Sequence, residues 1–324
     1  MNKVIVTGGA GFIGSAIVRA LLASGAGRVG VIDNLLSGQE SNLTEVRDNV
    51  DLHVADIRDY DAIAPVLKGA DRVFHLAAIP SVPRSISEPV PSHTANIDGT
   101  FNVLRACAEG GARRVVYAAS SSAYGDTLVL PKTESMMPCP KSPYAAQKLM
   151  GEHYAAVFAS CFGLETVSLR FFNVFGPRQD PSSPYSGVLS LFMKHLLART
   201  QPAIFGDGAQ SRDFTYVEDV AELCLKASLA DAAVVSGHMY NAGNGGRITL
   251  NETWKMLCAI EGVDIAPTFG PPRDGDVRDS QADTAAAVRD LGHAPRFSFE
   301  NGLRLTLEWY RANSKPPVKS VHEI

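Results

Sequence analysis

The sequence lacks long apolar runs and a large excess of either charge, and both absences exclude classes of protein. The 30 lysine and arginine residues nearly balance the 34 aspartate and glutamate residues, which leaves a net charge of −4. Neither nucleic acid nor an anionic membrane is expected as a partner of such a chain. No segment has the apolar length of a signal peptide or of a membrane span.

Cysteines and clustered metal ligands are also scarce. The five cysteines are scattered, odd in number and never at metal-binding spacing: Cys107, Cys139, Cys161, Cys224 and Cys258. We expect most of them to be small, buried hydrophobic residues in a reducing cytoplasm. The eight histidines form no cluster, and His75, within an apolar run, is expected to be a core residue. No metal site is predicted.

The first half of the chain has a regular alternation of short apolar runs and helical stretches. Five runs are predicted as buried strands: Val4–Val6, Val29–Asp33, His53–Asp56, Val73–Leu76 and Val115–Ala118. Three segments between them are typical of helices: Phe12–Leu22, Ala62–Lys68 and Ile97–Glu109. Such alternation predicts an α/β fold of Rossmann type, a doubly wound parallel sheet with helices on both faces.

The second half differs in its loops, which are longer and richer in proline and glycine. Its predicted helices are Val188–Leu197, Val217–Ser228 and Leu250–Ile260. We therefore divide the chain into a dinucleotide-binding domain over residues 1–170 and a smaller C-terminal substrate lobe over residues 171–312, with an interleaved boundary. The polar tail 313–324 contains adjacent prolines and is expected to fray.

A glycine-rich loop follows the first predicted strand. Gly8, Gly11 and Gly14 are three apart, which gives the pattern G-x-x-G-x-x-G. Glycines permit a tight turn, a close approach of the backbone to a pyrophosphate and tight packing of helix on strand. The helix that begins here directs its amino-terminal end at the phosphates. Between a strand and a helix, this pattern predicts a dinucleotide site.

Two aspartates at predicted strand ends bear on the identity of the cofactor. Asp33 lies nineteen residues past Gly14, where a carboxylate accepts hydrogen bonds from ribose hydroxyls and repels a 2′-phosphate. NAD is therefore predicted rather than NADP. Asp56, which Ile57 follows, either contacts the adenine or is an ordinary loop cap.

Tyr144 and Lys148, four residues apart at the start of a predicted helix, indicate the chemistry. Ser142 is predicted to cap this helix, and a proline follows in its first turn. The two side chains then share one helix face, where the ammonium lowers the pKa of the phenol and makes it a usable base. Ser120 follows a strand at the same sheet edge and can donate to a substrate or relay its proton. A base, a hydroxyl and a dinucleotide site together predict hydride transfer at a carbinol carbon.

These motifs resemble the extended short-chain dehydrogenases/reductases of the NAD-dependent epimerase/dehydratase family, and within it the nucleotide-sugar 4-epimerases. The matching segments cover nearly the whole chain: Thr7–Gly14, His75–Ala78, Asn96–Thr100, Ser120–Gly125, Tyr144–Lys148, Phe172–Val174, Ser211–Phe214 and Gly275–Arg278. The resemblance implies NAD as cofactor, a UDP-sugar as substrate, and Ser120, Tyr144 and Lys148 as catalytic residues.

The resemblance also implies two sets of binding residues. For NAD they are Gly8, Gly11, Phe12, Ile13, Gly14, Asp33, Asn34, Ser37, Gly38, Asp56, Ile57, Leu76, Ala77, Ala78, Asn96, Ser120, Tyr144, Lys148, Phe172 and Val174. For the UDP-sugar they are Ser81, Ser121, Ser122, Asn173, Gly187, Val188, Ala203, Ile204, Phe205, Arg212, Arg273, Asp276, Arg278 and Ser280. Asn173 and the arginines are expected at the pyrophosphate, which suits guanidinium geometry. Surface ion pairs are the alternative for Arg212 and Arg278.

The segment Ser120–Ser122 bears on the type of reaction. Relatives that dehydrate nucleotide sugars resemble Thr-Asp-Glu here, because elimination of water needs an extra acid and base. This segment has no carboxylate, which favours 4-epimerisation by oxidation and re-reduction. The alternatives are a UDP-glucuronate 4-epimerase, a nucleotide-sugar reductase or decarboxylase, and a NAD-dependent binding protein without catalysis. For Ser121 and Ser122 a simple turn role stays open.

The choice of sugar depends on Ser280. In the 4-epimerases that the chain resembles, the residue four positions after the aspartate of the Gly-Asp pair borders the sugar pocket. A bulky aromatic residue there would block a 2-N-acetyl group, whereas serine leaves space. The stretch Ser81–Ser85 also resembles the N-acetyl-sugar epimerases. We expect interconversion of UDP-GlcNAc and UDP-GalNAc, with UDP-Glc and UDP-Gal as further substrates.

The helix predicted over Tyr144–Ala159 carries apolar residues on more than one face. A second apolar face suggests pairing with another subunit. The resemblance implies a homodimer built on this helix and on Ile97–Glu109. Burial of the second face beneath the substrate lobe of the same chain is the alternative.

Overall fold

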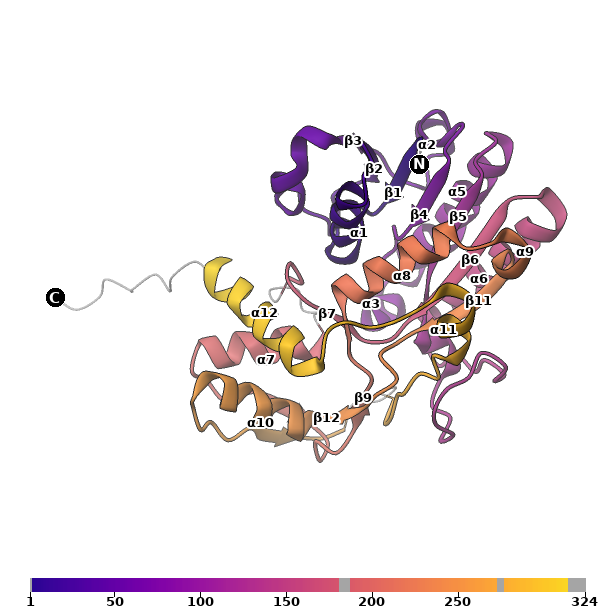
Figure 1. Ribbon diagram of the computed structural model, residues 1–324. Helices are drawn as coiled ribbons and strands as arrows, with labels where there is room; N and C mark the ends of the chain where they lie inside the picture. The colour runs from indigo at the N-terminus through magenta and orange to yellow at the C-terminus, as the bar shows by residue number, and fades with distance from the viewer. Residues whose placement is uncertain (1, 181–186, 273–276, 314–324) are drawn as a thin grey trace.

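The computed structural model describes residues 2–180, 187–272 and 277–313. Its centre is a sheet of seven parallel strands in the order β11-β6-β5-β4-β1-β2-β3 (Figure 1). The order reverses between β1 and β4, the switch point at which doubly wound sheets bind nucleotides. This confirms the predicted Rossmann-type fold. The strands are β1 (Val4–Thr7), β2 (Val29–Asp33), β3 (Val50–Val54), β4 (Arg72–His75), β5 (Arg114–Ser120), β6 (Glu165–Phe171) and β11 (His238–Ala242).

Burial along the strands follows their place in the sheet. The central strands β1, β4 and β5 are buried almost throughout, as a parallel sheet covered on both faces requires. The strand predicted over His53–Asp56 begins at Val50 instead and ends at Val54. Most of its side chains are exposed, because it lies at the edge of the sheet with β2 as its neighbour. The predicted burial of this strand is therefore wrong.

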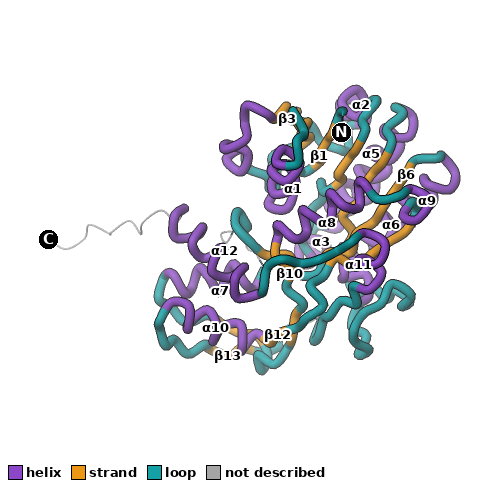
Figure 2. The backbone as a smooth tube through the Cα atoms, viewed as in Figure 1, coloured by secondary structure: helices purple, strands orange, loops and turns teal. Residues whose placement is uncertain are grey.

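Helices cover both faces of the sheet, as Figures 1 and 2 show. One face carries α1 (Phe12–Ala23) packed against α8 (Val217–Leu229). The other carries α2 (Tyr60–Leu67), α5 (Gly99–Glu109) and α6 (Pro143–Phe162). The other helical segments of this part of the fold are η1 (Glu40–Asn49), α3 (Val82–Ser87), α4 (Pro89–His93), η2 (Thr94–Asp98), η3 (Ser121–Tyr124), α9 (Ala232–Val235) and α11 (Ala285–Leu291).

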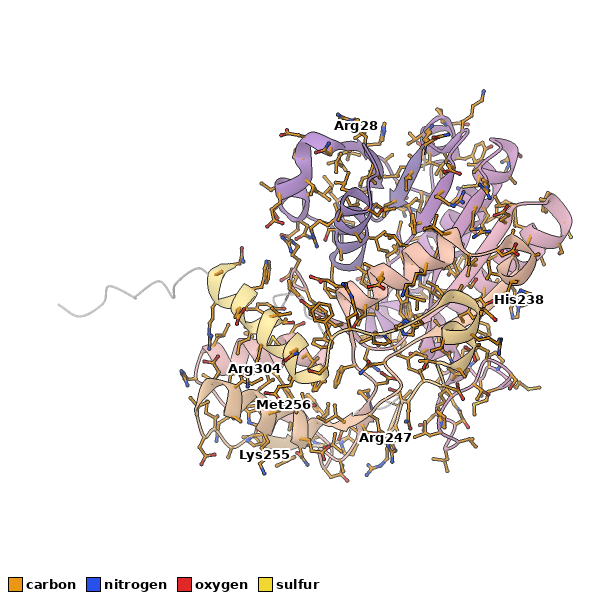
Figure 3. The ribbon with its side chains drawn as sticks, in the orientation of Figure 1. Arg28, His238, Arg247, Lys255, Met256 and Arg304 are labelled. Atoms are coloured by element: carbon orange, nitrogen blue, oxygen red, sulfur yellow. The ribbon has the colours of Figure 1, made fainter. Side chains whose placement is uncertain are left out.

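The second lobe has its own core, which includes Phe192, Trp254 and Leu307. Charged side chains such as Lys255 and Arg304 are exposed on its surface (Figure 3). Within the described ranges, no helix is both long and apolar enough to cross a membrane. The elements of the lobe are α7 (Val188–Leu197), α10 (Leu250–Glu261), α12 (Phe299–Asn313), and the strand pairs β7 (Val174–Phe175) with β10 (Thr215–Tyr216), β8 (Ala203–Phe205) with β13 (Thr268–Gly270), and β9 (Ser211–Arg212) with β12 (Ile248–Thr249).

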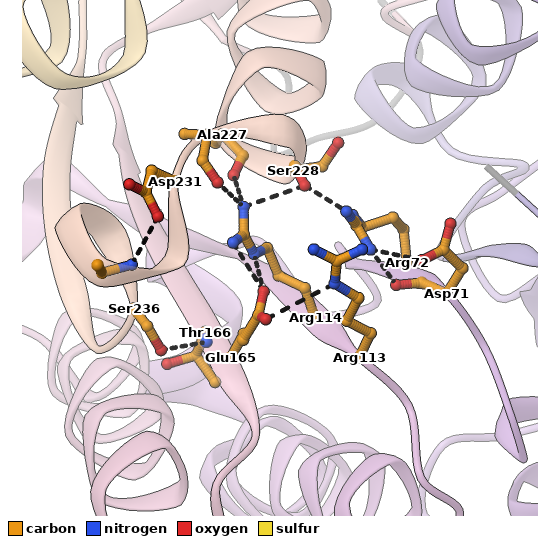
Figure 4. Close-up of polar contacts among 12 residues, drawn as sticks. Asp71, Arg72, Arg113, Arg114, Glu165, Thr166, Ala227, Ser228, Asp231 and Ser236 are labelled. Carbon is orange, nitrogen blue, oxygen red and sulfur yellow. Dashed lines mark hydrogen bonds and ion pairs between the residues drawn. The ribbon is translucent and has the colours of Figure 1, made fainter.

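Arginines at the amino-terminal end of the sheet hold α8 in place (Figure 4). Arg72 Nε donates to Ser228 O, and Arg114 Nη1 donates to Ala230 O, both at 2.6 Å. Glu165, the first residue of β6, accepts a hydrogen bond from Arg114 at 2.7 Å. The cations complement the negative end of the α8 dipole. Because α8 and β11 come from the second half of the sequence, a division near residue 170 does not cut the chain cleanly.

Candidate active site

A cavity of about 1340 Å³ lies at the carboxyl ends of the strands, between the sheet and the second lobe. Pockets for one small ligand have volumes of roughly 300–1,000 Å³, so this cavity has room for two ligands. It brings together most of the residues predicted to form the site. These are Gly8, Gly11, Phe12, Ile13, Gly14, Asp33, Asn34, Ser37, Gly38, Asp56, Ile57, Leu76, Ala77, Ala78, Ser81, Ser120, Ser121, Ser122, Tyr144, Lys148, Phe172, Asn173, Val174, Gly187, Arg212 and Ser280.

The first loop turns sharply from β1 into α1. Gly8 has a left-handed φ of 71°, and its N–H donates to Ile32 O at 2.7 Å. A Cβ atom on Gly14 would lie 2.0 Å from Gly8 O, so the helix packs on the loop too closely for a side chain. Gly11 precedes α1 without a side-chain cap, and the first turn of α1 holds no acidic residue. The positive end of α1 is therefore available for phosphate groups.

Asp33 ends β2 at the wall of the cavity and is 7% exposed. Its carboxylate accepts the N–H groups of Leu35 and Ala10, each at 2.9 Å. Burial raises the pKa of Asp33, and the two hydrogen bonds oppose that rise. Gly38 packs so closely that a Cβ atom there would lie 2.8 Å from the carboxylate oxygens. The residues thus fit NAD, since a fixed carboxylate at this place binds ribose hydroxyls and repels a 2′-phosphate.

Asp56 has the geometry of a loop cap. Its carboxylate accepts the Arg58 N–H at 2.9 Å. The Arg58 guanidinium and the Asn34 amide also donate to it, at 2.7 Å and 2.8 Å. The hydrogen bonds from Arg58 hold the pKa of Asp56 well below its ordinary value. Since Asp56 and Ile57 also line the cavity, the contact with adenine stays a prediction.

The predicted catalytic hydroxyls meet at the end of β5 and the start of α6. Ser142 caps α6 by accepting the Ala145 N–H at 3.2 Å, which places Tyr144 in the first turn. Tyr144 and Ser120 are hydrogen-bonded, and Ser120 Oγ lies 2.8 Å from Ser122 Oγ. The three hydroxyl groups form a chain along which a proton can pass. The Ser122 N–H also donates to Ser120 Oγ at 3.2 Å, as in a turn, so a role for Ser122 beyond that turn stays a prediction.

Lys148 lies one helical turn beyond Tyr144 and is buried. Its Nζ donates to Ala118 O at 2.8 Å and lies 5.0 Å from the centre of the Tyr117 ring. Burial lowers the pKa of Lys148 to about 8, and the Glu152 carboxylate opposes that shift. The ammonium therefore titrates close to neutral pH, the range in which acid–base groups are most effective.

The pKa of Tyr144 differs from the prediction. Burial raises it, and the hydrogen bond with Ser120 opposes only part of that rise. Lys148 was expected to lower it, but the ammonium is bonded to Ala118 O and the desolvation of the phenol dominates. When bound, NAD supplies a hydride acceptor and a positive charge, which favours the phenolate.

Two segments of the second lobe meet at the same cavity. Asn173 has a positive φ of 29°, and its Nδ2 donates to Ser280 Oγ at 3.0 Å and to Asp213 O at 2.9 Å. Arg212 lines the wall beside them, and its Nη1 donates to Arg278 O at 2.9 Å. A guanidinium, an amide and a small hydroxyl therefore stand together opposite the nucleotide loop.

The sequence profile of the NAD dependent epimerase/dehydratase family matches residues 4–243. The chain belongs to this family. It is 37% identical over 317 residues to a UDP-glucose 4-epimerase of Mycolicibacterium smegmatis, a match that covers 97% of this chain and 100% of that protein. As a member of the NAD dependent epimerase/dehydratase family, the protein is an NAD-dependent enzyme.

Solved structures of the family agree with this assignment. The UDP-N-acetylglucosamine 4-epimerase from Methanobrevibacter ruminantium, in complex with UDP-N-acetylmuramic acid, is 38% identical with a TM-score of 0.91. The match covers 96% of this chain and 98% of that one. The UDP-glucose 4-epimerase of Thermus thermophilus, in complex with NAD, is 36% identical with a TM-score of 0.87, covering 96% and 99%. NAD is the cofactor of this epimerase/dehydratase family member.

Several residues that were predicted to bind NAD or the UDP-sugar do not line the cavity in the described part of the chain: Asn96, Val188, Ala203, Ile204, Phe205 and Arg278. Arg278 forms an exposed ion pair with Asp207 at 3.1 Å, the alternative foreseen for it. Asn96 is buried behind the wall, where its Oδ1 accepts the Ile79 N–H at 2.7 Å. Ile204 packs in the core of the second lobe. Arg273 and Asp276 lie outside the described residues.

The cavity of this epimerase/dehydratase family member also contains basic residues that were not predicted: Arg58, Arg84, Lys132 and Lys141. Lys132 is 1% exposed, and its Nζ donates to Thr127 O. Lys132 also pairs with Ala282 through a backbone bridge. Because this pairing joins distant parts of the chain, no local sequence signal could have predicted that Lys132 lies at the cavity. Over the described ranges, no group of three or more histidine, cysteine or acidic side chains could hold a metal ion.

Proposed function

We propose that this enzyme is a 4-epimerase of UDP-hexoses, acting on UDP-GlcNAc and UDP-GalNAc, with UDP-Glc and UDP-Gal as further substrates. The observation that carries the proposal is the hydroxyl chain Tyr144–Ser120–Ser122 beside Lys148, in a cavity with room for two ligands. The segment Ser120–Ser122 contains no carboxylate, so elimination of water lacks the acid that it needs there.

In the proposed reaction Tyr144, as phenolate, accepts the proton of the sugar 4-hydroxyl, directly or through Ser120. NAD, held by the glycine loop and Asp33, would supply the acceptor for the C4 hydride and later its donor, so that the sugar would pass through a 4-keto form. The keto sugar turns within the cavity while its UDP stays bound. Tyr144 gives the proton back to the 4-oxygen when C4 is reduced on its other face. Lys148, one helical turn from Tyr144, places a positive charge on the same helix face, which opposes the effect of burial on the phenol.

This mechanism requires tight binding of the nucleotide and weak binding of the sugar, so that the sugar can turn. Arg212 supports the first requirement, because a guanidinium on the cavity wall suits the oxygens of a pyrophosphate. Asn173 stands beside it and adds an amide. The second requirement is met by the small side chains Ser121 and Ser280, which leave space for a turning ring.

The proposal for N-acetyl sugars rests on Ser280. Relatives of similar identity carry the names of either a UDP-glucose or a UDP-N-acetylglucosamine 4-epimerase. The similarity to these relatives therefore favours neither sugar. We base the choice on the space at the cavity wall. Ser280 lines that wall with a hydroxyl that already accepts a hydrogen bond from Asn173. A 2-N-acetyl group fits beside a side chain of this size.

Incubation of the purified protein with UDP-GlcNAc, and separately with UDP-Glc, tests the proposal when the sugar protons are followed by NMR. Appearance of the 4-epimer from UDP-GlcNAc is the expected result. An epimer from UDP-Glc alone would keep the mechanism and overturn the choice of sugar. No epimer from either substrate would overturn the proposed function for these sugars.

Ser280→Tyr is expected to abolish activity on UDP-GlcNAc and to spare activity on UDP-Glc. The larger side chain would fill the space that the N-acetyl group needs, while the reacting C4 end stays open. Initial rates on both substrates measure the effect, and Ser280→Ala is the control, since it keeps the space and loses only the hydroxyl. Acetyl-sugar activity retained in Ser280→Tyr would contradict this role for Ser280.

A UDP-glucuronate 4-epimerase is the second candidate. The partly exposed guanidinium of Arg84 at the cavity favours it, since a hexuronate carries a carboxylate that could compete with Glu88 for this side chain. UDP-glucuronate as a third substrate in the NMR experiment separates this candidate from the first.

We also propose a homodimer, in a cytoplasm to which the five free thiols are suited. Met150, Val157 and Phe162 of α6 and Phe101 of α5 are between 38% and 61% exposed, so the second lobe does not cover them. Tyr154 joins the two helices through its ring contact with Phe101 at 5.6 Å. An apolar surface shared by two neighbouring helices is typical of an interface.

Light scattering is expected to give twice the mass of one chain for the wild type. Val157→Glu places a charge within this surface, and we expect it to shift the mass toward a monomer. Val234→Glu, at an apolar residue that is equally exposed on α9, is the control and should remain a dimer. A monomeric wild type would contradict the proposed assembly.

A further inference from the structure

A buried ion pair lies directly behind the catalytic end of α6. Glu152 follows Lys148 by four residues, as Lys148 follows Tyr144, so the three side chains share one helix face. The Glu152 carboxylate accepts Arg170 Nε at 2.9 Å and Arg170 Nη2 at 2.7 Å. Arg170 comes from β6, and its side chain is 2% exposed, against 6% for Glu152. Neither Glu152 nor Arg170 has a role in the proposed reaction as described above.

Packing alone is a poor account of the pair. Buried ion pairs are often no more stabilising than apolar residues of the same size, because both charges lose their hydration. Arg170 also leaves its Nη1 buried without a hydrogen-bond partner in the described part of the chain. Its guanidinium carbon lies 4.4 Å from the centre of the Tyr124 ring. An electrostatic role explains the two charges better.

Few groups near Lys148 carry a charge. His75 on β4 is neutral, because burial lowers its pKa to about 3. Tyr117 on β5 is also neutral, because burial raises its pKa well above the ordinary value. Tyr144 and Glu152 face Lys148 from α6 itself. Among the described residues, Glu152 is the carboxylate that acts on the ammonium.

We propose that Glu152 acts through Lys148 as a positioning residue: its buried carboxylate, held by Arg170, sets the pH range in which the catalytic end of α6 works. The proposal rests on the proposed 4-epimerase function. A negative charge here favours the protonated form of Lys148 and disfavours the phenolate of Tyr144. Removal of the Glu152 charge lowers the pKa of Lys148 and of Tyr144. The acidic and the alkaline limb of the pH–rate profile therefore both move to lower pH.

Glu152→Gln tests the proposal, because it removes the charge and keeps the shape of the side chain. We expect both limbs of the pH profile of kcat/KM to move to lower pH by roughly half a unit to one unit. Glu165→Gln is the matched control, since it alters the ion pair with Arg114 at the far end of the sheet (Figure 4). It should lower the midpoint of thermal unfolding without moving either limb.

Two further variants separate charge from packing. Glu152→Asp keeps the charge, so its limbs should stay where those of the wild type are. The double variant Glu152→Gln/Arg170→Met removes both charges, and its limbs should lie between those of the wild type and those of Glu152→Gln. Limbs that move equally in Glu152→Asp and Glu152→Gln, or that move in neither, would overturn the proposal.

A titration of Tyr144 tests the proposal without turnover. The phenolate absorbance of each NAD-loaded protein is followed across a range of pH. The same titration is made on the same protein with Tyr144→Phe added, and the difference between the two curves gives the pKa of Tyr144. This pKa should fall in Glu152→Gln even if none of the tested UDP-sugars is epimerised. A failure of the proposed function is thereby distinguished from an unchanged pKa, which would overturn the role of Glu152.

Discussion

Tyr144→Phe will lose nearly all epimerisation and keep its NAD. The change removes the proposed base and the hydrogen bond with Ser120, but not the glycine loop or Asp33. A positioned acid–base group contributes about 10²–10⁴-fold to a rate, and this one acts in both halves of the reaction. We therefore expect kcat to fall by about 10³-fold or more. Initial rates with UDP-GlcNAc measure the loss, and the NAD released from denatured protein measures cofactor content.

The control for this variant is Tyr60→Phe. Tyr60 is on α2 at the surface, hydrogen-bonded to Glu109 and outside the cavity lining, so its phenol should not affect the rate. A Tyr144→Phe enzyme that kept more than roughly a tenth of the wild-type rate would contradict the assignment of the base. A variant that lost its NAD as well would contradict the separation of catalysis from cofactor binding.

The positions of the glycine loop and of the proposed catalytic trio could be predicted because their signals are local. The glycine spacing belongs to one turn, Asp33 to the end of one strand, and the spacing of Tyr144 and Lys148 to one helix face. A parallel sheet then brings all its carboxyl ends to one edge, so that residues far apart in the sequence form one site. Ser120 joined the site by the same rule, at the end of β5.

The second lobe was harder to predict, because pairing between distant segments decides which side chains face the cavity. Ile204 is on β8, whose partner β13 comes much later in the chain, and it faces the core of the lobe. The sequence allowed Arg278 to pair either with a pyrophosphate or with an acidic side chain. In the structure it pairs with Asp207, a contact that depends on loop geometry and has no periodic signal in the sequence. Glu152 shares a predictable helix face with Lys148, but its partner on β6 could not be foreseen.

Gly14→Ala is expected to lose both bound NAD and stability. The added Cβ atom would lie 2.0 Å from Gly8 O and 2.8 Å from Gly8 C, which are backbone atoms. Gly8 cannot yield easily, because its N–H is bonded to Ile32 O at 2.7 Å and its φ is left-handed. We therefore expect α1 to shift away from the loop and its first amides to leave the positions that phosphates need. Overpacking of this kind costs about 1–3 kcal/mol of unfolding free energy.

Gly27→Ala is the matched control for this substitution, because a Cβ atom there would meet nothing within 4 Å. NAD content per chain and denaturant unfolding should match the wild type in Gly27→Ala and fall together in Gly14→Ala. A loss of stability with full NAD content would mean that Gly14 serves only the packing of α1 on β1. A wild-type NAD content at wild-type stability would show that the loop tolerates a side chain, contrary to the proposed pyrophosphate contact.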